Sequence, residues 1–568
     1  MPATARWRWR VGAVERALAR AHPRGARVFL RSSVFFPAAA KAAPCAATAA
    51  TAKMSAARLL AAVCLLCPAA ARAPNFLFLI TDDQDKLALP VMPALRERVV
   101  AQGLAFDAAH TSSPICCPSR TSLFSGRYSH NLNDPVLGWC GNFSGEEEDN
   151  FLLGLSNAGY RVAQHGKWFN QEAQFSPPYV PRWHAPGNDF FVMTEEGVYI
   201  NNTFNSNGAA FRCSPLTPGG SYLTSCLGNR TAAWLREATA GDSAVPWVAY
   251  IAPHAPHLPA TPAPWYAEAA LPSDTAPRTP AWNVGWEDKH WQVDNGIDKP
   301  MSPALIAGSD ALWRARLRTL MSVDDLLAEA LDIVEGAGAW TRENTFIIHT
   351  SDHAYHLGSW GLWSEKAQPY DADTRVPLAV RGPGVARGAV SRALVTNLDL
   401  PPTLLELAGA PNGWPTSAGE RRDGVSLVPL LAGGGGGAPP PGWRDRLLIE
   451  FVGWQNYEWL APCAWGLTPA PCTGNASADA SGLINARSNN YVALRIVNET
   501  VDTLVADFRP PLAPLAREQT NWTEAYDVAA DPWTLTNLAV KGRMPADALQ
   551  RMRDELWAVA TCAGASCP

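Results

Sequence analysis

The chain of 568 residues is long enough for a large hydrophobic core and for two domains. Its formal net charge of −5 at pH 7 is small for this length, which argues against a surface that binds nucleic acid or acidic membranes. After residue 73 no stretch is apolar enough to cross a bilayer, so we expect no membrane span.

The first 73 residues contain two segments that we expect the mature protein to lack. Residues 1–53 form an extension with eight Arg, two Lys and a single acid. It is either a transit peptide or, as we favour, an untranslated part that precedes a start at Met54. Residues 54–73 have a short apolar core followed by small residues, which is the pattern of a secretory signal peptide. We therefore expect passage through the secretory pathway and an extracellular, cell-wall or lysosome-like location.

Apolar runs that end in polar clusters alternate with helical segments between residues 74 and 432, the expected catalytic domain. In chain order we expect a strand at 76–81, helices at 93–102 and 151–158, strands at 160–163 and 247–252, a helix at 311–335 and a strand at 345–349. This alternation predicts an α/β fold with a mostly parallel sheet flanked by helices. Because ligands bind beyond the carboxyl ends of such strands, we expect the polar clusters to form one site.

A second, smaller part follows a low-complexity segment. Residues 433–442 are rich in Gly and Pro and are expected to form a linker or exposed loop. Residues 443–568 contain two strand-like runs, 447–451 and 491–497, and a helical run at 545–559. We expect a C-terminal α+β subdomain there.

The cysteines and the sequons both agree with an oxidising, secretory compartment. Nine Cys follow the signal segment, and three close pairs are candidates for local disulfides: Cys213/Cys226, Cys463/Cys472 and Cys562/Cys567. If Cys116 is set aside, Cys117 is left with Cys140, although sequence alone does not prove the pairing. The candidate glycosylation sites are Asn142, Asn201, Asn229, Asn475, Asn498 and Asn521.

Carboxylates follow two of the predicted strands. Asp82 and Asp83 come directly after the first strand, and Asp352 and His353 follow the last one. Taken singly, each pair could equally be a helix cap or a polar loop. Together, three carboxylates and one imidazole suit a divalent cation, and oxygen-rich ligation favours calcium or magnesium over zinc.

The most informative stretch runs from residue 115 to residue 127 and reads Ile-Cys-Cys-Pro-Ser-Arg-Thr-Ser-Leu-Phe-Ser-Gly-Arg. The pattern Cys-x-Pro-Ser-Arg followed by Gly-Arg resembles the signature of the type I sulfatases. Other matching runs extend the resemblance to most of the chain from residue 74 to residue 559. The family has an alkaline-phosphatase-like α/β architecture, and that is the fold the resemblance implies.

The resemblance also implies a chemistry. Cys116 would be oxidised by a formylglycine-generating enzyme, and the hydrated aldehyde would attack the sulfur of a sulfate ester and then expel sulfate. One Ca²⁺ per chain would be held by Asp82, Asp83, Asp352 and His353 together with the modified Cys116. The residues implied to contact the nucleophile, the sulfate, the leaving oxygen or the sugar are Arg120, Lys167, His254, Lys366 and His356.

Two positions depart from the family pattern. Many sulfatases have His two residues after the lysine of Gly-Lys-Trp, where this chain has Phe169, so the role of that His is unassigned and Asn170 is only a candidate. Ala354 stands where Gly is usual, and it would be strained if the backbone there needs a positive φ. The N-acetylglucosamine-6-sulfatases, which also lack that His, and the arylsulfatases of green algae are the most similar groups within the family.

We therefore expect a secreted hydrolase of sulfated sugars or aryl sulfates that acts through formylglycine and calcium. The first alternative is a metal-dependent phosphodiesterase or phosphatase of the same superfamily. Cys116 with Pro118 and Arg120 argues against it, because those enzymes use Ser or Thr and two zinc ions. The second alternative is an unconverted, inactive sulfatase-like protein that binds glycans.

Overall fold

The computed structural model describes residues 72–132, 150–170, 175–216, 220–241, 245–294, 299–410, 422–432, 439–452, 489–510 and 513–568. The predicted extension 1–53, nearly all of the predicted signal segment and most of the predicted linker lie outside these residues. Residues 71–568 are grouped as one compact unit by their contacts.

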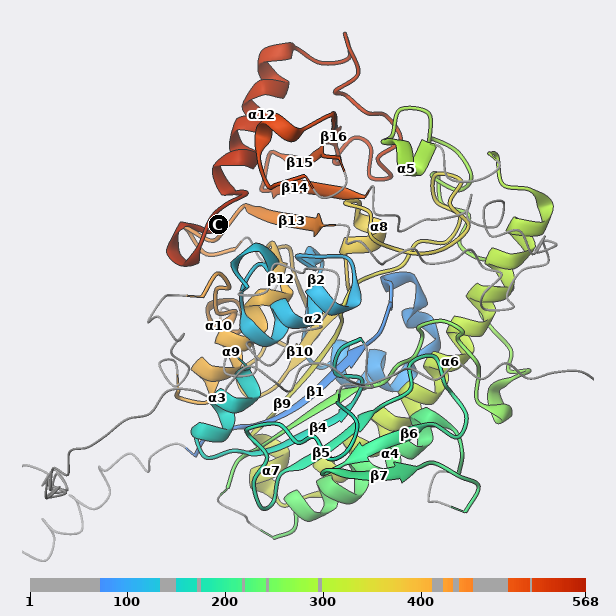
Figure 1. Cartoon of the computed structure of the whole chain (residues 1–568). Helices are drawn as coiled ribbons and strands as arrows, with labels where there is room; N and C mark the ends of the chain where they lie inside the picture. The colour runs from blue at the N-terminus through green and yellow to red at the C-terminus, as the bar shows by residue number, and fades with distance from the viewer. Residues whose placement is uncertain are drawn as a thin grey trace, which may run out of the picture. The chain divides into compact units, whose positions relative to one another are not determined.

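A ten-stranded sheet forms the centre of the described chain (Figure 1), in the order β11-β2-β10-β9-β1-β8-β4-β5-β6-β7. The five central strands, β9, β1, β8, β4 and β5, are parallel, whereas β10, β6 and β7 pair antiparallel with their neighbours. The bounds are β1 Asn75–Thr81, β2 Leu104–Phe106, β4 Arg161–Gly166, β5 Asp189–Met193, β6 Thr203–Ser206, β7 Ala209–Arg212, β8 Trp247–Ala252, β9 Thr345–Ser351, β10 Leu378–Arg381 and β11 Ala389–Ser391. The predicted, mostly parallel sheet is confirmed.

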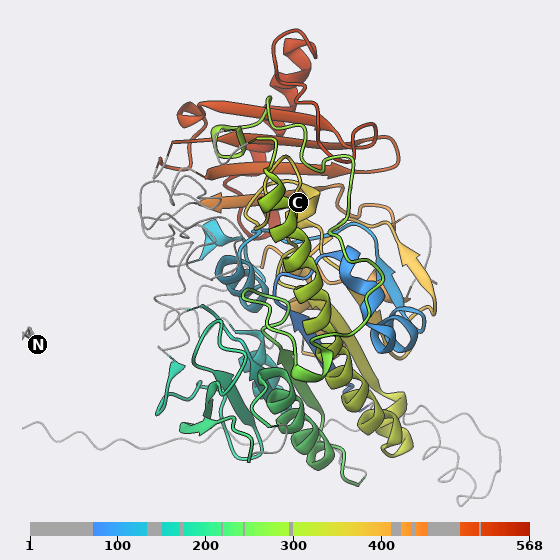
Figure 2. The same cartoon turned by 90° about the vertical axis from the view of Figure 1, so that its right-hand side faces the viewer.

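Helices cover both faces of this sheet, because alternate side chains of a strand point to opposite faces. Leu77 and Leu79 of β1 pack with α4 and α6, whereas Phe76 and Phe78 pack on the other face with α2, α3 and α9. Figure 2 shows the long helix α6 rising beside the sheet towards the C-terminal part. The helix bounds are α2 Cys116–Ser125, α3 Phe151–Asn157, α4 Leu223–Ala238, α5 Trp291–Asp294, α6 Pro303–Gly336, α7 Ala339–Glu343, α8 Asp371–Thr374, α9 Leu400–Leu407, α10 Val428–Ala432 and α12 Ala546–Val559.

The C-terminal part contains a four-stranded antiparallel sheet, β13-β14-β15-β16, formed by Arg446–Val452, Asn490–Val497, Asp502–Phe508 and Trp522–Asp527. Helix α12 packs on one face of it through Leu556 and Val559. The opposite face packs against the catalytic part, since Tyr491 and Tyr526 belong to the same core as α6. A short two-stranded sheet, β3 Ala109–His110 with β12 Val395–Thr396, lies in the catalytic part.

Most predicted elements are present, with two informative differences. Helix α6 begins eight residues earlier than predicted, because Ser302 caps it and Pro303 suits its first turn. The helical segment predicted at 93–102 is a π-helix at Leu95–Val100. The Asp324 carboxylate accepts hydrogen bonds from the backbone N–H groups of Ala94 and Leu95 at its start.

Two of the predicted disulfides, Cys213–Cys226 and Cys562–Cys567, are present. Cys117 is also disulfide-bonded, while its predicted partner Cys140 and the pair Cys463/Cys472 lie outside the described residues. Of the sequons, Asn498 and Asn521 are exposed and Asn201 and Asn229 are partly buried, and Asn142 and Asn475 fall outside the described part of the chain.

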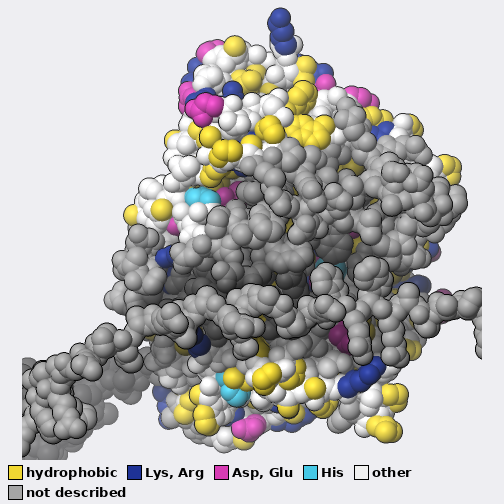
Figure 3. All heavy atoms as spheres, in the orientation of Figure 1, with side chains coloured by type: hydrophobic (Ala, Val, Ile, Leu, Met, Phe, Trp, Pro, Cys, Tyr) yellow, Lys and Arg dark blue, Asp and Glu magenta, His cyan; other side chains and the backbone are white. Residues whose placement is uncertain are grey.

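The described surface carries charges of both signs. Figure 3 shows basic and acidic side chains interspersed on the described part of one face, without a large patch of one sign. Within the described residues, every helix is too short or too polar to span a membrane.

Candidate active site

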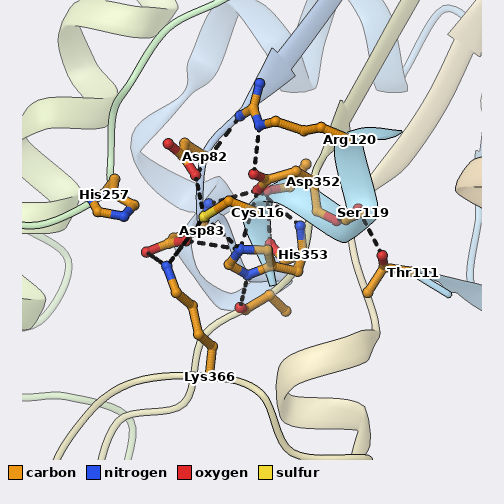
Figure 4. A network of polar contacts seen from close by, with 12 residues as sticks. Asp82, Asp83, Thr111, Cys116, Ser119, Arg120, His257, Asp352, His353 and Lys366 are labelled. Atoms are coloured by element: carbon orange, nitrogen blue, oxygen red, sulfur yellow. Dashed lines mark hydrogen bonds and ion pairs between the residues drawn. The ribbon is translucent and has the colours of Figure 1, made fainter. Parts of the chain in front are cut away.

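The polar clusters meet at the carboxyl edge of the central parallel strands, as the sequence predicted. Asp82 and Asp83 follow β1, Asp352 and His353 follow β9, and Lys167 follows β4. Because β9, β1, β8 and β4 are neighbours in that order, their ends deliver these side chains to one place. Figure 4 shows Asp82, Asp83, Asp352 and His353 converging around Cys116.

Cys116 is the first residue of α2 and is completely buried. It is the one free cysteine among the described residues. Its Sγ lies 3.5 Å from Asp82 Oδ1, 3.3 Å from His353 Nε2 and 3.5 Å from Lys366 Nζ. Burial and the nearby Asp82 carboxylate raise the pKa of the thiol well above its usual value, so an unmodified Cys116 is a poor thiolate nucleophile. The N-terminus of α2 favours negative charge at this point.

Arg120 lies one turn after Cys116 and faces the same site, as the spacing predicted. Its Nε donates to Asp352 Oδ2 at 2.9 Å, and its guanidinium is 3.8 Å from Asp82 Oδ1. Burial would lower its pKa, but Asp352 and Asp82 raise it above the usual value. Arg120 is therefore a permanent buried cation between two of the carboxylates.

Potential ligand atoms of Asp82, Cys116, Asp352 and His353 all lie within 4.8 Å of one another. A second set, Asp82, Asp83, Cys116 and His257, meets the same limit. The two sets share Asp82 and Cys116, so they describe one site rather than two. Three carboxylates are the hard oxygen donors that Ca²⁺ and Mg²⁺ prefer, and the residues present therefore fit a single divalent cation.

Lys366 reaches the site from a loop that is held in an uncommon conformation. Its Nζ contacts both carboxylate oxygens of Asp83, at 2.7 and 2.9 Å. The flanking residues Glu365 and Ala367 have φ values of 108° and 76°, in the left-handed region. Such strain persists only when surrounding contacts compensate for it, and here the Ala367 N–H donates to Pro114 O at 3.1 Å. Burial would lower the pKa of Lys366, but Asp83 raises it well above the usual value.

Gly166 explains how Lys167 enters the site. Gly166 has a φ of +96°, and a Cβ there would lie 2.1 Å from Ala252 O. Only glycine fits this close approach, which lets the Lys167 N–H donate to Ala252 O at 2.7 Å. The Lys167 ammonium then donates to Asp82 Oδ2 at 2.6 Å and to Glu196 Oε1 at 3.3 Å.

The site contains two groups that sequence reasoning missed, His257 and Glu196. His257 Nδ1 faces Leu258 O at 2.8 Å, so this nitrogen carries the proton and Nε2 offers its lone pair towards the Cys116 cluster. Burial lowers the pKa of His257 to about 3, which keeps the ring neutral. The second His of the Pro-His-Ala-Pro-His run was the available signal for His257. Glu196 lies in the loop after β5, and no motif in the sequence distinguishes it from other loop acids.

His254, the residue that we predicted from that run, lies next to His257. The two rings are tilted by 33° with their centroids 4.6 Å apart, and His254 Nδ1 is 3.3 Å from Asp82 Oδ2. His254 therefore contacts a cluster carboxylate.

His356 is not brought to the Cys116 cluster by any contact of the described residues. Its Nδ1 lies 2.7 Å from Asp373 Oδ1, and its ring faces Trp360 in a separate cavity. The predicted contact of His356 with the sugar or the sulfate stays a prediction.

The two departures from the family pattern have simple structural outcomes. Phe169 packs in an aromatic cluster beside Phe124. Its neighbour Asn170 donates to Glu196 Oε1 at 3.2 Å, so Asn170 belongs to the polar network. Ala354 is buried without a positive φ, so the strain that we considered there does not arise.

Known proteins resemble this chain in both sequence and fold. The Sulfatase family model matches residues 74–410. Human N-acetylglucosamine-6-sulfatase is 30% identical over 512 residues, covering 88% of this chain and 86% of the human protein. The Volvox carteri arylsulfatase is 28% identical over 564 residues, covering 90% and 79%. A protein solved in complex with its substrate D-glucosamine-2-N,6-O-disulfate superposes with a TM-score of 0.61 at 20% identity, covering 85% of this chain and 97% of that one.

These matches confirm the resemblance drawn from residues 115–127 and the predicted alkaline-phosphatase-like architecture. The chain belongs to the sulfatase family and is an enzyme that hydrolyses sulfate esters.

Proposed function

We propose that this sulfatase removes sulfate from a sulfated sugar, using formylglycine at position 116 and one bound Ca²⁺. The buried position of Cys116, between three carboxylates and three cationic side chains, carries this proposal. When bound, Ca²⁺ would polarise the sulfate and offset its charge. Formylglycine would supply a hydroxyl nucleophile that the high-pKa thiol cannot replace.

The charge balance of the site supports an anionic substrate. Asp82, Asp83 and Asp352 contribute −3, and the cations Arg120, Lys167 and Lys366 contribute +3, so the six groups sum to zero. A divalent cation would raise the sum to +2, and Glu196 would reduce it to +1. A sulfate monoester carries one negative charge, which matches that excess in a site shielded from water.

The side chains also have separable roles in the proposal. Arg120 holds two of the carboxylates in place, and Lys167 holds Asp82. The groups proposed to face the leaving oxygen are Lys366 and the imidazole of His254, as in the sequence prediction. A sugar alcohol is a poor leaving group, so a proton must reach its oxygen as the S–O bond breaks.

The relatives suggest the kind of substrate. A glucosamine sulfate is named for both the human relative and the structural neighbour. We therefore infer a sulfated glycan with a glucosamine 6-sulfate unit as the first substrate to test, with aryl sulfates as the comparison. The disulfides among the described residues support maturation in an oxidising compartment, where a formylglycine-generating enzyme would act on Cys116.

Mass spectrometry combined with kinetics tests this proposal. The enzyme is produced with a formylglycine-generating enzyme, and the peptide that contains Cys116 is weighed. We expect the mass change for exchange of sulfur and two hydrogens for one oxygen at Cys116, because Cys117 is already disulfide-bonded. An unmodified Cys116 in an active preparation would refute the formylglycine assignment.

Substrate preference tests the remaining alternatives. The kcat/KM for glucosamine 6-sulfate is compared with the values for 4-nitrophenyl sulfate and 4-nitrophenyl phosphate. We expect hydrolysis of both sulfates, with the Cys116→Ala variant folded by circular dichroism but inactive. A preference for the phosphate, together with two zinc ions per chain, would favour the phosphatase alternative. A folded, unmodified protein that binds the sugar sulfate without turnover would favour the glycan-binding alternative.

A further inference from the structure

Glu196 lies at the border between the catalytic cluster and solvent. It comes from the loop after β5, and its side chain is 23% exposed. By contrast, the three carboxylates of the cluster and the side chains of Lys167 and Lys366 are at most 3% exposed. Glu196 therefore places a carboxylate at the edge of a site that is otherwise buried.

The two carboxylate oxygens of Glu196 have different surroundings. Oε1 accepts hydrogen bonds from Lys167 Nζ at 3.3 Å and from Asn170 Nδ2 at 3.2 Å, and it lies 4.0 Å from His257 Nε2. Within the described residues, Oε2 takes part in no hydrogen bond or ion pair. Burial would raise the pKa of Glu196, but the Lys167 ammonium lowers it below its usual value, so the side chain is ionised at neutral pH. One oxygen is thus bound to the cluster, and the other is left for a substrate.

The loop holds Glu196 in a fixed place. The buried Asn202 side chain donates to two carbonyl oxygens of the loop, on either side of Glu196, at 2.7 and 2.9 Å. The Tyr199 hydroxyl donates to His257 O at 2.7 Å, which ties the loop to the turn after β8. A group on a loop with these contacts loses little conformational freedom when a ligand binds.

A fixed carboxylate in this position acts on the charge of the substrate. Glu196 and Asp82 contact the same Lys167 ammonium, at 3.3 and 2.6 Å, and Asp82 contacts Cys116. All substituents of one pyranose bound at Cys116 would lie within about 10 Å of Glu196, and a unit charge at that distance changes binding by roughly tenfold when the effective dielectric constant is about 20. The charge on the rest of the sugar should therefore affect its affinity.

We propose that Glu196 sets the charge specificity of the enzyme, favouring a sulfated sugar that carries an amine over one that carries a second sulfate. The carboxylate attracts the ammonium of glucosamine and repels an N-sulfate group, whereas an uncharged hydroxyl is intermediate. Oε2 can also accept a hydrogen bond from the ammonium or from a hydroxyl of the sugar. The inference rests on the proposed function, because it takes a sulfated sugar as the substrate, and it adds which sugars the site prefers.

Calorimetric titration of the whole Cys116→Ala enzyme, with Ca²⁺ present, tests the proposal without hydrolysis of the ligand. The ligands are glucosamine 6-sulfate, glucose 6-sulfate and N-sulfoglucosamine 6-sulfate, at about pH 6.5 where the amine is protonated. We expect the affinity to fall in that order, with the first bound at least about tenfold more tightly than the last. Equal affinity for the three sugars, or no binding of any of them at about 10 mM, would overturn the proposal.

A substitution of Glu196 itself identifies the residue. Glu196→Gln removes the charge but keeps an oxygen that can accept from Lys167 and Asn170, so the fold should be unchanged. In this variant, the ratio of the affinities for glucosamine 6-sulfate and N-sulfoglucosamine 6-sulfate should fall at least about tenfold. Glu195→Gln is the matched control and should leave the ratio unchanged. It removes the same charge one residue away, from an exposed side chain whose carboxylate accepts from the Thr203 N–H at 2.8 Å.

Two results would contradict the assignment even if the sugars bind. If Glu196→Gln weakens the binding of all three sugars alike, Glu196 only positions Lys167. If Glu195→Gln lowers the ratio as much as Glu196→Gln does, the effect comes from the general charge of the loop. Turnover separates this inference from the proposed function. A ratio that depends on Glu196, in an enzyme that hydrolyses 4-nitrophenyl sulfate but not glucosamine 6-sulfate, would support the charge specificity and refute the sugar substrate.

Discussion

His130 joins the catalytic part to the C-terminal part through three hydrogen bonds. Its Nδ1 lies 2.9 Å from Glu450 Oε2 on β13, and its Nε2 lies 2.8 Å from Cys562 O near the chain end. Its backbone N–H donates to Glu450 Oε1 at 3.2 Å. Both ring nitrogens face acceptors, so the charged imidazolium satisfies the site and the neutral ring does not. We predict that His130→Gln weakens the folded state in a pH-dependent way.

The magnitude follows from the pKa of His130. Burial would lower this pKa, but the Glu450 carboxylate raises it from 6.5 to about 9. This rise in the pKa stabilises the folded state by about 3 kcal/mol, since a shift of one pKa unit corresponds to about 1.4 kcal/mol. The ring is only 10% exposed, so solvent screening reduces this little. Because the folded-state pKa is raised, the stabilisation is complete below pH 6.5 and is lost as the pH rises through about 9.

Urea unfolding of the wild type and of His130→Gln, at several pH values from 6 to 9.5, measures this effect. We expect His130→Gln to lower the free energy of unfolding by about 3 kcal/mol at pH 6 and by under about 1 kcal/mol at pH 9.5. Taking the difference at each pH cancels the other titrating groups. His184→Gln, in a loop of the catalytic part, is the control. A difference that stays constant across this pH range would refute the reasoning.

Three further predictions concern the active site. Gly166→Ala should lower kcat/KM at least about 100-fold, because the new Cβ would lie 2.1 Å from Ala252 O and would displace Lys167. An unchanged kcat/KM would show that the close contact between Gly166 and Ala252 does not position Lys167. Removal of metal with EGTA should lower kcat at least about tenfold, with recovery in Ca²⁺ but not Zn²⁺, and Asp83→Asn should prevent recovery. Lys366→Ala and His254→Ala should slow glucosamine 6-sulfate about 10²-fold more than 4-nitrophenyl sulfate, whereas equal losses would make these residues sulfate anchors.

The strand ends were the most predictable part of the site. A continuous apolar run such as 76–81 indicates a strand buried on both faces, and the polar residues after it must lie at the sheet edge. The placement of Arg120 at the same site as Cys116 was predictable for a similar reason, since the two residues lie one turn apart on α2. These inferences need only local periodicity and a general rule of sheet topology.

His257 and Glu196 show where such reasoning stops. His254 and His257 follow the same strand, and only the turn after β8 decides which ring faces Cys116. Glu196 comes from the loop after β5 and contacts Lys167, 29 residues away in the sequence. The first turns of α6 were missed for another reason. Proline breaks a helix in its interior but is tolerated in the first turn, and Pro303 is the first residue of α6.

The positions of Asp83 and Lys366 cannot be predicted from the residues near them in the sequence. Asp83 has a φ of 72°, and its N–H donates to Asp352 Oδ1 at 3.1 Å across 269 residues of sequence. The residues on either side of Lys366 also have positive φ values. Non-glycine residues adopt this conformation only when distant contacts compensate for the strain, so no pattern within one segment predicts it. The parallel strands bring the reacting groups to one edge, and the strained loops then fix their contact distances.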